Sequence, residues 1–123
     1  MSTRTKTRNL VTWFEIHATD PERARSFYGN VFGWSFENEA PSYDMIGMGE
    51  GAPIGGGLTA VREGGAPMNV FNVQVEDVAA TCDTVVQAGG SVVIAMQTTP
   101  TGLDFAYVAD PDGSVFGLWK PGN

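Results

Sequence analysis

The stretch that decides the fold runs from residue 20 to residue 34 and reads DPERARSFYGNVFGW. Asp20 followed by Pro21 is typical of a helix start, because the aspartate caps the first N–H groups and proline fits the first turn. Gly33 is typical of a helix C-cap. Between them, apolar residues recur at helical spacing, which predicts an amphipathic helix. The predicted apolar face comprises Ala24, Phe27, Tyr28, Val31 and Phe32.

The same punctuation returns in the second half of the chain. Asp77 is placed to cap a second helix, and Gly89-Gly90 is placed to end it. Asp20 and Gly33 lie the same distance ahead of Asp77 and Gly90, so the two halves superpose without a gap. Matched spacing of this kind indicates two copies of one structural unit. The apolar stripe of the second helix comprises Val78, Cys82, Val85 and Val86.

Each helix is expected to follow one strand and to precede three more. Runs rich in β-branched and aromatic residues, bounded by turn residues, predict these strands. In the first half they cover residues 10–17, 34–37, 43–48 and 54–61, and in the second half 69–75, 91–96, 104–108 and 115–120. The expected fold is α+β, a single domain over residues 1–123. Its two βαβββ modules cover residues 10–61 and 69–120, with a linker at 62–68.

Composition limits the classes of partner and compartment. The formal net charge of −7 disfavours a nucleic acid partner, because a phosphate backbone would be repelled. Cys82 is the only cysteine, so no intrachain disulfide forms, and a reducing cytoplasm is expected. Arg4, Lys6 and Arg8 belong to a leader that we interpret as a frayed tail without the apolar core of a signal peptide. No stretch reaches the roughly 20 apolar residues of a membrane span. A cytoplasmic protein without a membrane partner is the expectation.

Sequence motifs spread over nearly the whole chain point to a known family. They include Phe27-Tyr28, VFGW at residues 31–34, and the tight-turn sequence DPDG at 110–113 that leads to FGLW at 116–119. With the βαβββ repeat, they make the chain resemble the vicinal-oxygen-chelate superfamily, which holds glyoxalases, bleomycin-resistance proteins and extradiol dioxygenases. The resemblance implies eight strands in curved sheets around a cup, usually within a homodimer.

The resemblance also implies where a metal would bind. In metal-dependent members, four strands each supply one His, Glu or Gln ligand, because a divalent ion needs nitrogen or oxygen donors. Carried over to this chain, the four positions are Trp13, Gly57, Val70 and Gly117. None of these side chains can bind a metal. We therefore expect no metal and no cofactor at this place.

The lining of the implied cup follows from strand alternation. Residues two apart on a strand face the same side, so Trp13, Glu15 and His17 are expected to share one face. The same rule groups Val70, Asn72 and Gln74 on one strand, and Val115, Gly117 and Trp119 on another. The facing strand, with Gly55, Gly57 and Thr59, has little side-chain bulk.

This composition predicts a roomy pocket for a flat, largely apolar, aromatic small molecule. The expected ligand-binding residues are Trp13, Gly57, Val70, Asn72, Gly117 and Trp119. The alternative is that both tryptophans fill the core and that the glycines mark close strand packing.

Glu15 and His17 are the candidate catalytic residues. Two residues apart on one strand, they lie about 7 Å apart at Cβ, close enough to act on one substrate. A partly buried acid has a raised pKa and can act as a general acid or base near neutrality. The alternative is structural, with His17 solvated at the strand end and Glu15 paired with an arginine.

Three functions follow from these residues. The first is sequestration of an aromatic drug or toxin without chemistry, as in the bleomycin-resistance branch. The second is a metal-independent enzyme of natural-product metabolism (an isomerase, lyase, cyclase or hydroxylase) that uses Glu15 and His17 as acid and base. The third is a metalloenzyme with displaced ligands, a glyoxalase or dioxygenase; it ranks last because His17 is the only histidine.

Overall fold

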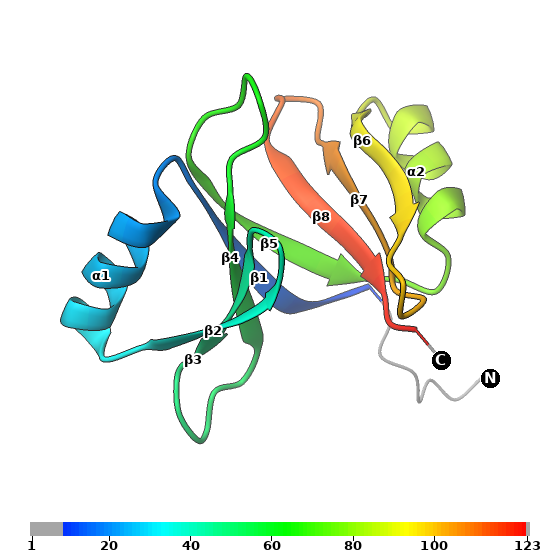
Figure 1. The fold of residues 1–123 in the computed structure, drawn as a ribbon. Coiled ribbons are helices and arrows are strands. Elements are labelled where there is room, and N and C mark those ends of the chain that lie inside the picture. Colours follow the sequence, from blue (N-terminus) through cyan, green and yellow to red (C-terminus); the bar gives the residue numbers. More distant parts are fainter. Residues whose placement is uncertain (1–8, 123) are drawn as a thin grey trace. The chain divides into compact units, whose positions relative to one another are not determined.

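The computed structural model describes residues 9–122, and the predicted leader with Arg4, Lys6 and Arg8 lies outside them. Two helices and eight strands follow one another in the predicted order (Figure 1). The first half comprises β1 (Leu10–Ala18), α1 (Pro21–Phe32), β2 (Ser35–Ala40), β3 (Tyr43–Gly47) and β4 (Gly55–Ala60). The second half comprises β5 (Met68–Gln74), α2 (Val78–Gln87), β6 (Ser91–Thr98), β7 (Asp104–Ala109) and β8 (Val115–Lys120). The predicted α+β class is confirmed.

The described residues form two compact units. The first unit is the continuous stretch Thr12–Phe71, and the second unit combines residues 9–11 with 72–122. In the first unit the strands lie in the order β2-β3-β4-β1, and β1 runs parallel to β4. In the second unit the order is β5-β8-β7-β6, and β5 runs parallel to β8. The border between the units falls within β1 and β5.

Both helices begin as the sequence predicts. Asp20 accepts a hydrogen bond from the backbone N–H of Arg23 at 3.2 Å, and Asp77 accepts one from Ala80 at 2.9 Å. Gly33 adopts the left-handed conformation at φ 73°, which ends α1. Such caps satisfy backbone groups that the helix itself leaves without partners. The repeated aspartate therefore has the same physical role in both halves.

One face of each sheet packs against its helix. In the first unit Ile16, Ala18, Ile46 and Leu58 form a buried apolar cluster, which packs against Ala24 and Tyr28 of α1. In the second unit Val75, Val78, Cys82, Ala106, Val108 and Leu118 form the corresponding core. Cys82 is buried, and burial, followed by the nearby charge of Asp83, raises the pKa of its thiol.

The apolar face predicted for α1 is only partly buried, which corrects the prediction. Phe27, Val31 and Phe32 remain 56%, 53% and 59% exposed. The apolar contact of α1 with the buried cluster is narrow, because Ala24 and Tyr28 make it. Tyr28 also stacks on Trp34, with ring centroids 5.7 Å apart. Val86 on α2 is likewise exposed rather than part of the buried stripe. No helix among residues 9–122 is long and apolar enough to cross a membrane.

Candidate functional site

The face of the first unit's sheet that turns away from the α1 core carries a group of polar and aromatic side chains. Strand β1 alternates, with Ile16 and Ala18 in the core under α1. The residues between and before them, Trp13, Glu15 and His17, are linked to one another through side-chain hydrogen bonds that include Tyr43. Their expected position on one shared face is what the structure has.

The hydrogen bonds form a continuous array across β1 and β3. The Nε2 atom of His17 lies 2.9 Å from Oε1 of Glu15. The hydroxyl of Tyr43 donates to Oε2 of Glu15 at 2.7 Å and accepts from Nε1 of Trp13 at 2.9 Å. Both carboxylate oxygens of Glu15 are thus engaged, one by an imidazole and one by a phenol. The order along the array is Trp13, Tyr43, Glu15, His17.

The array is largely shielded from water. Only 9% of the Glu15 side chain and 13% of the His17 side chain are accessible to solvent. Burial raises the pKa of Tyr43 well above its ordinary value, and the charge of Glu15 and the hydrogen bond to it raise it further. The hydrogen bond from Trp13 acts in the opposite direction and is the smallest of the four effects. Tyr43 is therefore a neutral donor across the physiological pH range.

The glycine-rich strand β4 does not leave the empty space that the sequence suggested. The Trp13 ring packs directly against Gly55, and the Tyr43 hydroxyl packs directly against Gly57. A β-carbon at either glycine would clash with these side chains. At these two positions the alternative interpretation, close packing, describes the structure. The glycines make room for the array rather than for a ligand.

The second unit shows the same correction at Gly117. Gly117 of β8 lies opposite Asn72 of β5, and the buried carboxamide of Asn72 occupies the place where a side chain at Gly117 would project. The space expected there is filled. Trp119, two residues further along β8, is half-buried and lies opposite Gln74. Val70 of β5, which belongs to the first unit, is buried.

The residues present do not fit a metal site of the family's kind. Trp13, Gly57, Val70 and Gly117 offer no donor side chain, and both oxygens of Glu15 already have partners. Within residues 9–122, no three or more His, Cys, Asp or Glu side chains converge as metal ligands.

An open depression of about 280 Å³ lies beside His17 within the first unit. Its lining combines β1 and α1 with the start of β5, and is mostly apolar in residue type. The lining residues are Ile16, His17, Ala18, Ala24, Tyr28, Pro67, Met68 and Asn69. His17 borders this depression together with Ile16 and Ala18, whose side chains face α1.

Tyr43 is the member of the array whose role the sequence did not reveal. It is one of three tyrosines, and nothing in the sequence indicates where its hydroxyl points. Its alignment follows from the pairing of Tyr43 with Thr59, which in turn lies opposite His17. The turn residues Pro41 and Ser42 precede β3 directly and indicate in the sequence where this strand begins.

Comparison with known proteins agrees with this architecture. The sequence profile of the Glyoxalase/Bleomycin resistance protein/Dioxygenase superfamily matches residues 10–118. The chain belongs to this superfamily. A relative from Mycobacterium bovis, named "Putative glyoxylase", is 31% identical over 115 residues, which are 88% of this chain and 44% of that protein. The chain thus spans less than half the length of this relative. A glyoxylase-like domain-containing protein of Didymella fabae is 32% identical, covering 91% of this chain and 94% of that protein.

Solved structures share the fold of this chain. Methylmalonyl-CoA epimerase from Mycobacterium tuberculosis has a TM-score of 0.66 at 15% identity, covering 99% of this chain and 94% of that one. A superfamily member from Vibrio splendidus has a TM-score of 0.61 at 19% identity, covering 87% of this chain and 95% of that one. At these identities the likeness concerns the fold.

Proposed function

We propose that this chain binds a small organic molecule beside His17 and catalyses a proton transfer on it without a metal. The observation that carries the proposal is the buried array in which Glu15 accepts from Tyr43 and contacts His17 at 2.9 Å. An imidazole oriented by a carboxylate is the arrangement by which proteins prepare histidine as a general base.

Glu15 selects the tautomer of His17. An ionised carboxylate only accepts hydrogen bonds, so the contact with Glu15 requires the proton of a neutral His17 to be on Nε2. The basic lone pair is then on Nδ1. In the proposed step Nδ1 takes a proton from a carbon next to a carbonyl group, the C–H electron pair moves toward the carbonyl oxygen, and the imidazolium later returns the proton to carbon.

Tyr43 and Trp13 support this role in different ways. Tyr43 donates to the second oxygen of Glu15, which stabilises the ionised carboxylate that an imidazolium needs as its partner. Trp13 fixes the Tyr43 hydroxyl through its indole N–H, and its half-buried ring offers an apolar surface.

Deuterium exchange tests the proposal directly. The protein is incubated in D2O with methylmalonyl-CoA, the compound in the name of the structurally similar epimerase. In separate samples it is incubated with a panel of flat aromatic natural products that carry ketone groups. Mass spectrometry is expected to find a protein-dependent gain of deuterium in at least one probe, and His17→Asn is expected to abolish that gain. If the gain persists undiminished in His17→Asn, His17 is not the base and the proposal fails.

Sequestration of an aromatic drug or toxin is the second candidate function. The half-buried ring of Trp13, held in place by its hydrogen bond to Tyr43, favours it, because a fixed indole is a stacking surface for a flat ligand. Quenching of tryptophan fluorescence identifies ligands from the same aromatic panel. Under this function the bound compound returns chemically unchanged after long incubation, and no probe gains deuterium.

A further inference from the structure

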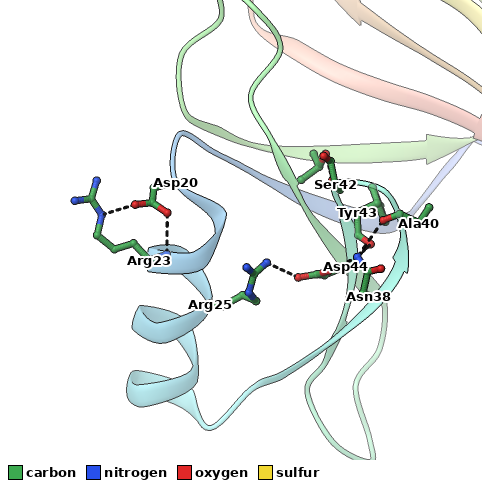
Figure 2. Close-up of polar contacts among 9 residues, drawn as sticks. Asp20, Arg23, Arg25, Asn38, Ala40, Ser42, Tyr43 and Asp44 are labelled. Carbon is green, nitrogen blue, oxygen red and sulfur yellow. Dashed lines mark hydrogen bonds and ion pairs between the residues drawn. The ribbon is translucent and has the colours of Figure 1, made fainter.

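On the α1 side of the same sheet, a second polar cluster lies behind the candidate site. Arg25 of α1 reaches Asp44 of β3, with Nη1 2.7 Å from Oδ2 (Figure 2). Only 8% of the Asp44 side chain is accessible, whereas 39% of the Arg25 side chain is. The side-chain amide of Asn38 donates to the other oxygen of Asp44 at 3.1 Å. The buried carboxylate is thus held between a helix and the neighbouring strand.

Asn38 also binds the backbone of the hairpin that joins β2 and β3. Its amide nitrogen donates to the carbonyl oxygen of Ala40 at 3.0 Å and to that of Tyr43 at 3.3 Å. These contacts span a β-bulge, because the pairing register shifts between Asn38 and Ala40. Figure 2 shows Asn38, Ala40, Tyr43 and Asp44 gathered at this hairpin. A bulge changes the direction of the side chains next to it. A neighbouring side chain therefore keeps one fixed direction only if the backbone geometry of the bulge is fixed.

The turn itself is under backbone strain. Ser42 has a φ of 60°, a conformation that residues other than glycine adopt at a cost. The Thr59 hydroxyl donates to the Ser42 carbonyl at 2.7 Å, and Asn38 holds the residues on either side of the turn. Tyr43 is the first residue after this turn. Since successive side chains of a strand face opposite sides, Asp44 points toward α1 and Tyr43 points toward Glu15.

We infer that Asn38 is a positioning residue for the candidate site and acts on it through Tyr43. By fixing the bulge and the Tyr43 carbonyl, with Asp44 as its anchor, Asn38 aims the Tyr43 hydroxyl at Glu15. Glu15 then keeps the hydrogen-bond donor that holds it toward His17. This inference rests on the proposed function, because only a site that uses the Glu15–His17 pair requires Tyr43 to be aimed there.

The indole N–H of Trp13 reports the position of Tyr43 without any ligand, since it donates to the Tyr43 hydroxyl. Its resonance in a ¹H–¹⁵N spectrum is assigned with Trp13→Phe and distinguished from those of Trp34 and Trp119. In Asn38→Ala the Trp13 indole proton is expected to shift and to exchange with water about tenfold faster, because its acceptor is no longer held in place. Tyr43→Phe, which removes the acceptor, gives the limiting shift.

Glu39→Ala is the matched control, because Glu39 is the exposed residue of the bulge next to Asn38. It is expected to leave the Trp13 indole signal as in the parent, and the Trp34 indole signal is expected to change in neither variant. A purely structural role would lower the melting temperature of Asn38→Ala and leave the Trp13 signal of the folded protein unmoved, which overturns the inference. If Asn38→Ala does not fold, Asn38→Gln, whose amide is displaced by one methylene, is measured under the same criteria.

The proposed function and this inference fail separately. Absence of deuterium exchange into any probe counts against proton transfer and leaves the indole signal free to show whether Asn38 positions Tyr43. An unmoved indole signal in both Asn38 variants counts against the positioning role, even where deuterium exchange is observed. In an active protein, Asn38→Ala is also expected to lower the exchange rate more than it weakens probe binding, which a loss of fold would not produce.

Discussion

Glu15 is the side chain that links His17 to Tyr43 in the candidate site, through one hydrogen-bonding contact with each of them. One of its oxygens faces His17 and the other accepts from Tyr43, so a change at this carboxylate alters both neighbours. Alternation along β1 was enough to predict that Trp13, Glu15 and His17 share a face. The direct contact between Glu15 and His17 was not predictable, because it depends on rotamers that Tyr43 helps to select.

Glu15→Gln separates proton transfer from simple binding. The amide keeps the size of the side chain but removes the charge that orients and stabilises a protonated His17. We expect deuterium exchange to fall by about 10²- to 10⁴-fold, the range for losing general acid–base catalysis, while binding of the same probe changes little. Fluorescence titration measures the affinity, and mass spectrometry measures the exchange. Equal losses in both would indicate that Glu15 holds the ligand rather than the base.

Tyr43→Phe tests the pKa of the phenol through the pH dependence of stability. The folded-state pKa of Tyr43 is raised above its ordinary value of 10.0, so the folded protein holds this proton more tightly than the unfolded chain does. The resulting stabilisation is complete below pH 10 and is lost as the pH rises above that value. The parent is therefore expected to lose stability in alkali more steeply than Tyr43→Phe in urea unfolding measured from neutral to alkaline pH. Parallel curves would contradict the raised pKa.

At the scale of elements, the matched caps explain why both helices were predictable. An aspartate at the start and glycine near the end are local signals that tertiary contacts did not override. The buried width of α1 was not predictable in the same way. Spacing alone places Phe27 and Val31 on the apolar face, but only the sheet decides how much of that face it covers. The filling of the space at Gly117 by Asn72 likewise depends on a neighbouring strand.

The two caps are expected to contribute similar stability. Asp77→Ala and Asp20→Ala each remove a side chain that accepts from the backbone of the first helical turn, which typically costs about 1 kcal/mol. Chemical denaturation monitored by circular dichroism measures the change. Asp→Asn at the same positions is the control, since asparagine caps comparably well. An Ala variant as stable as its Asn counterpart would show that the cap is not stabilising.

At the scale of the whole molecule, the homodimer expected from the family resemblance stays a prediction. Strands β2 and β6 stand at the ends of the described strand order, and exposed strand edges tend to pair or to be covered. The exposed Phe27, Val31 and Phe32 add apolar surface. Light scattering at micromolar concentration is expected to give twice the mass of one chain. A value equal to one chain would contradict the dimer.

The two compact units differ in how their residues are distributed along the chain. The first unit is the continuous stretch Thr12–Phe71, whereas the second needs residues 9–11 together with residues 72–122. During synthesis by the ribosome, every residue of the first unit is available before the second unit is complete. Contacts between residues far apart in sequence form slowly, because a long loop must close first. The first unit, which carries Trp13, Glu15, His17 and Tyr43, can therefore begin folding on the nascent chain, while residues 9–11 must wait for the C-terminal half to emerge.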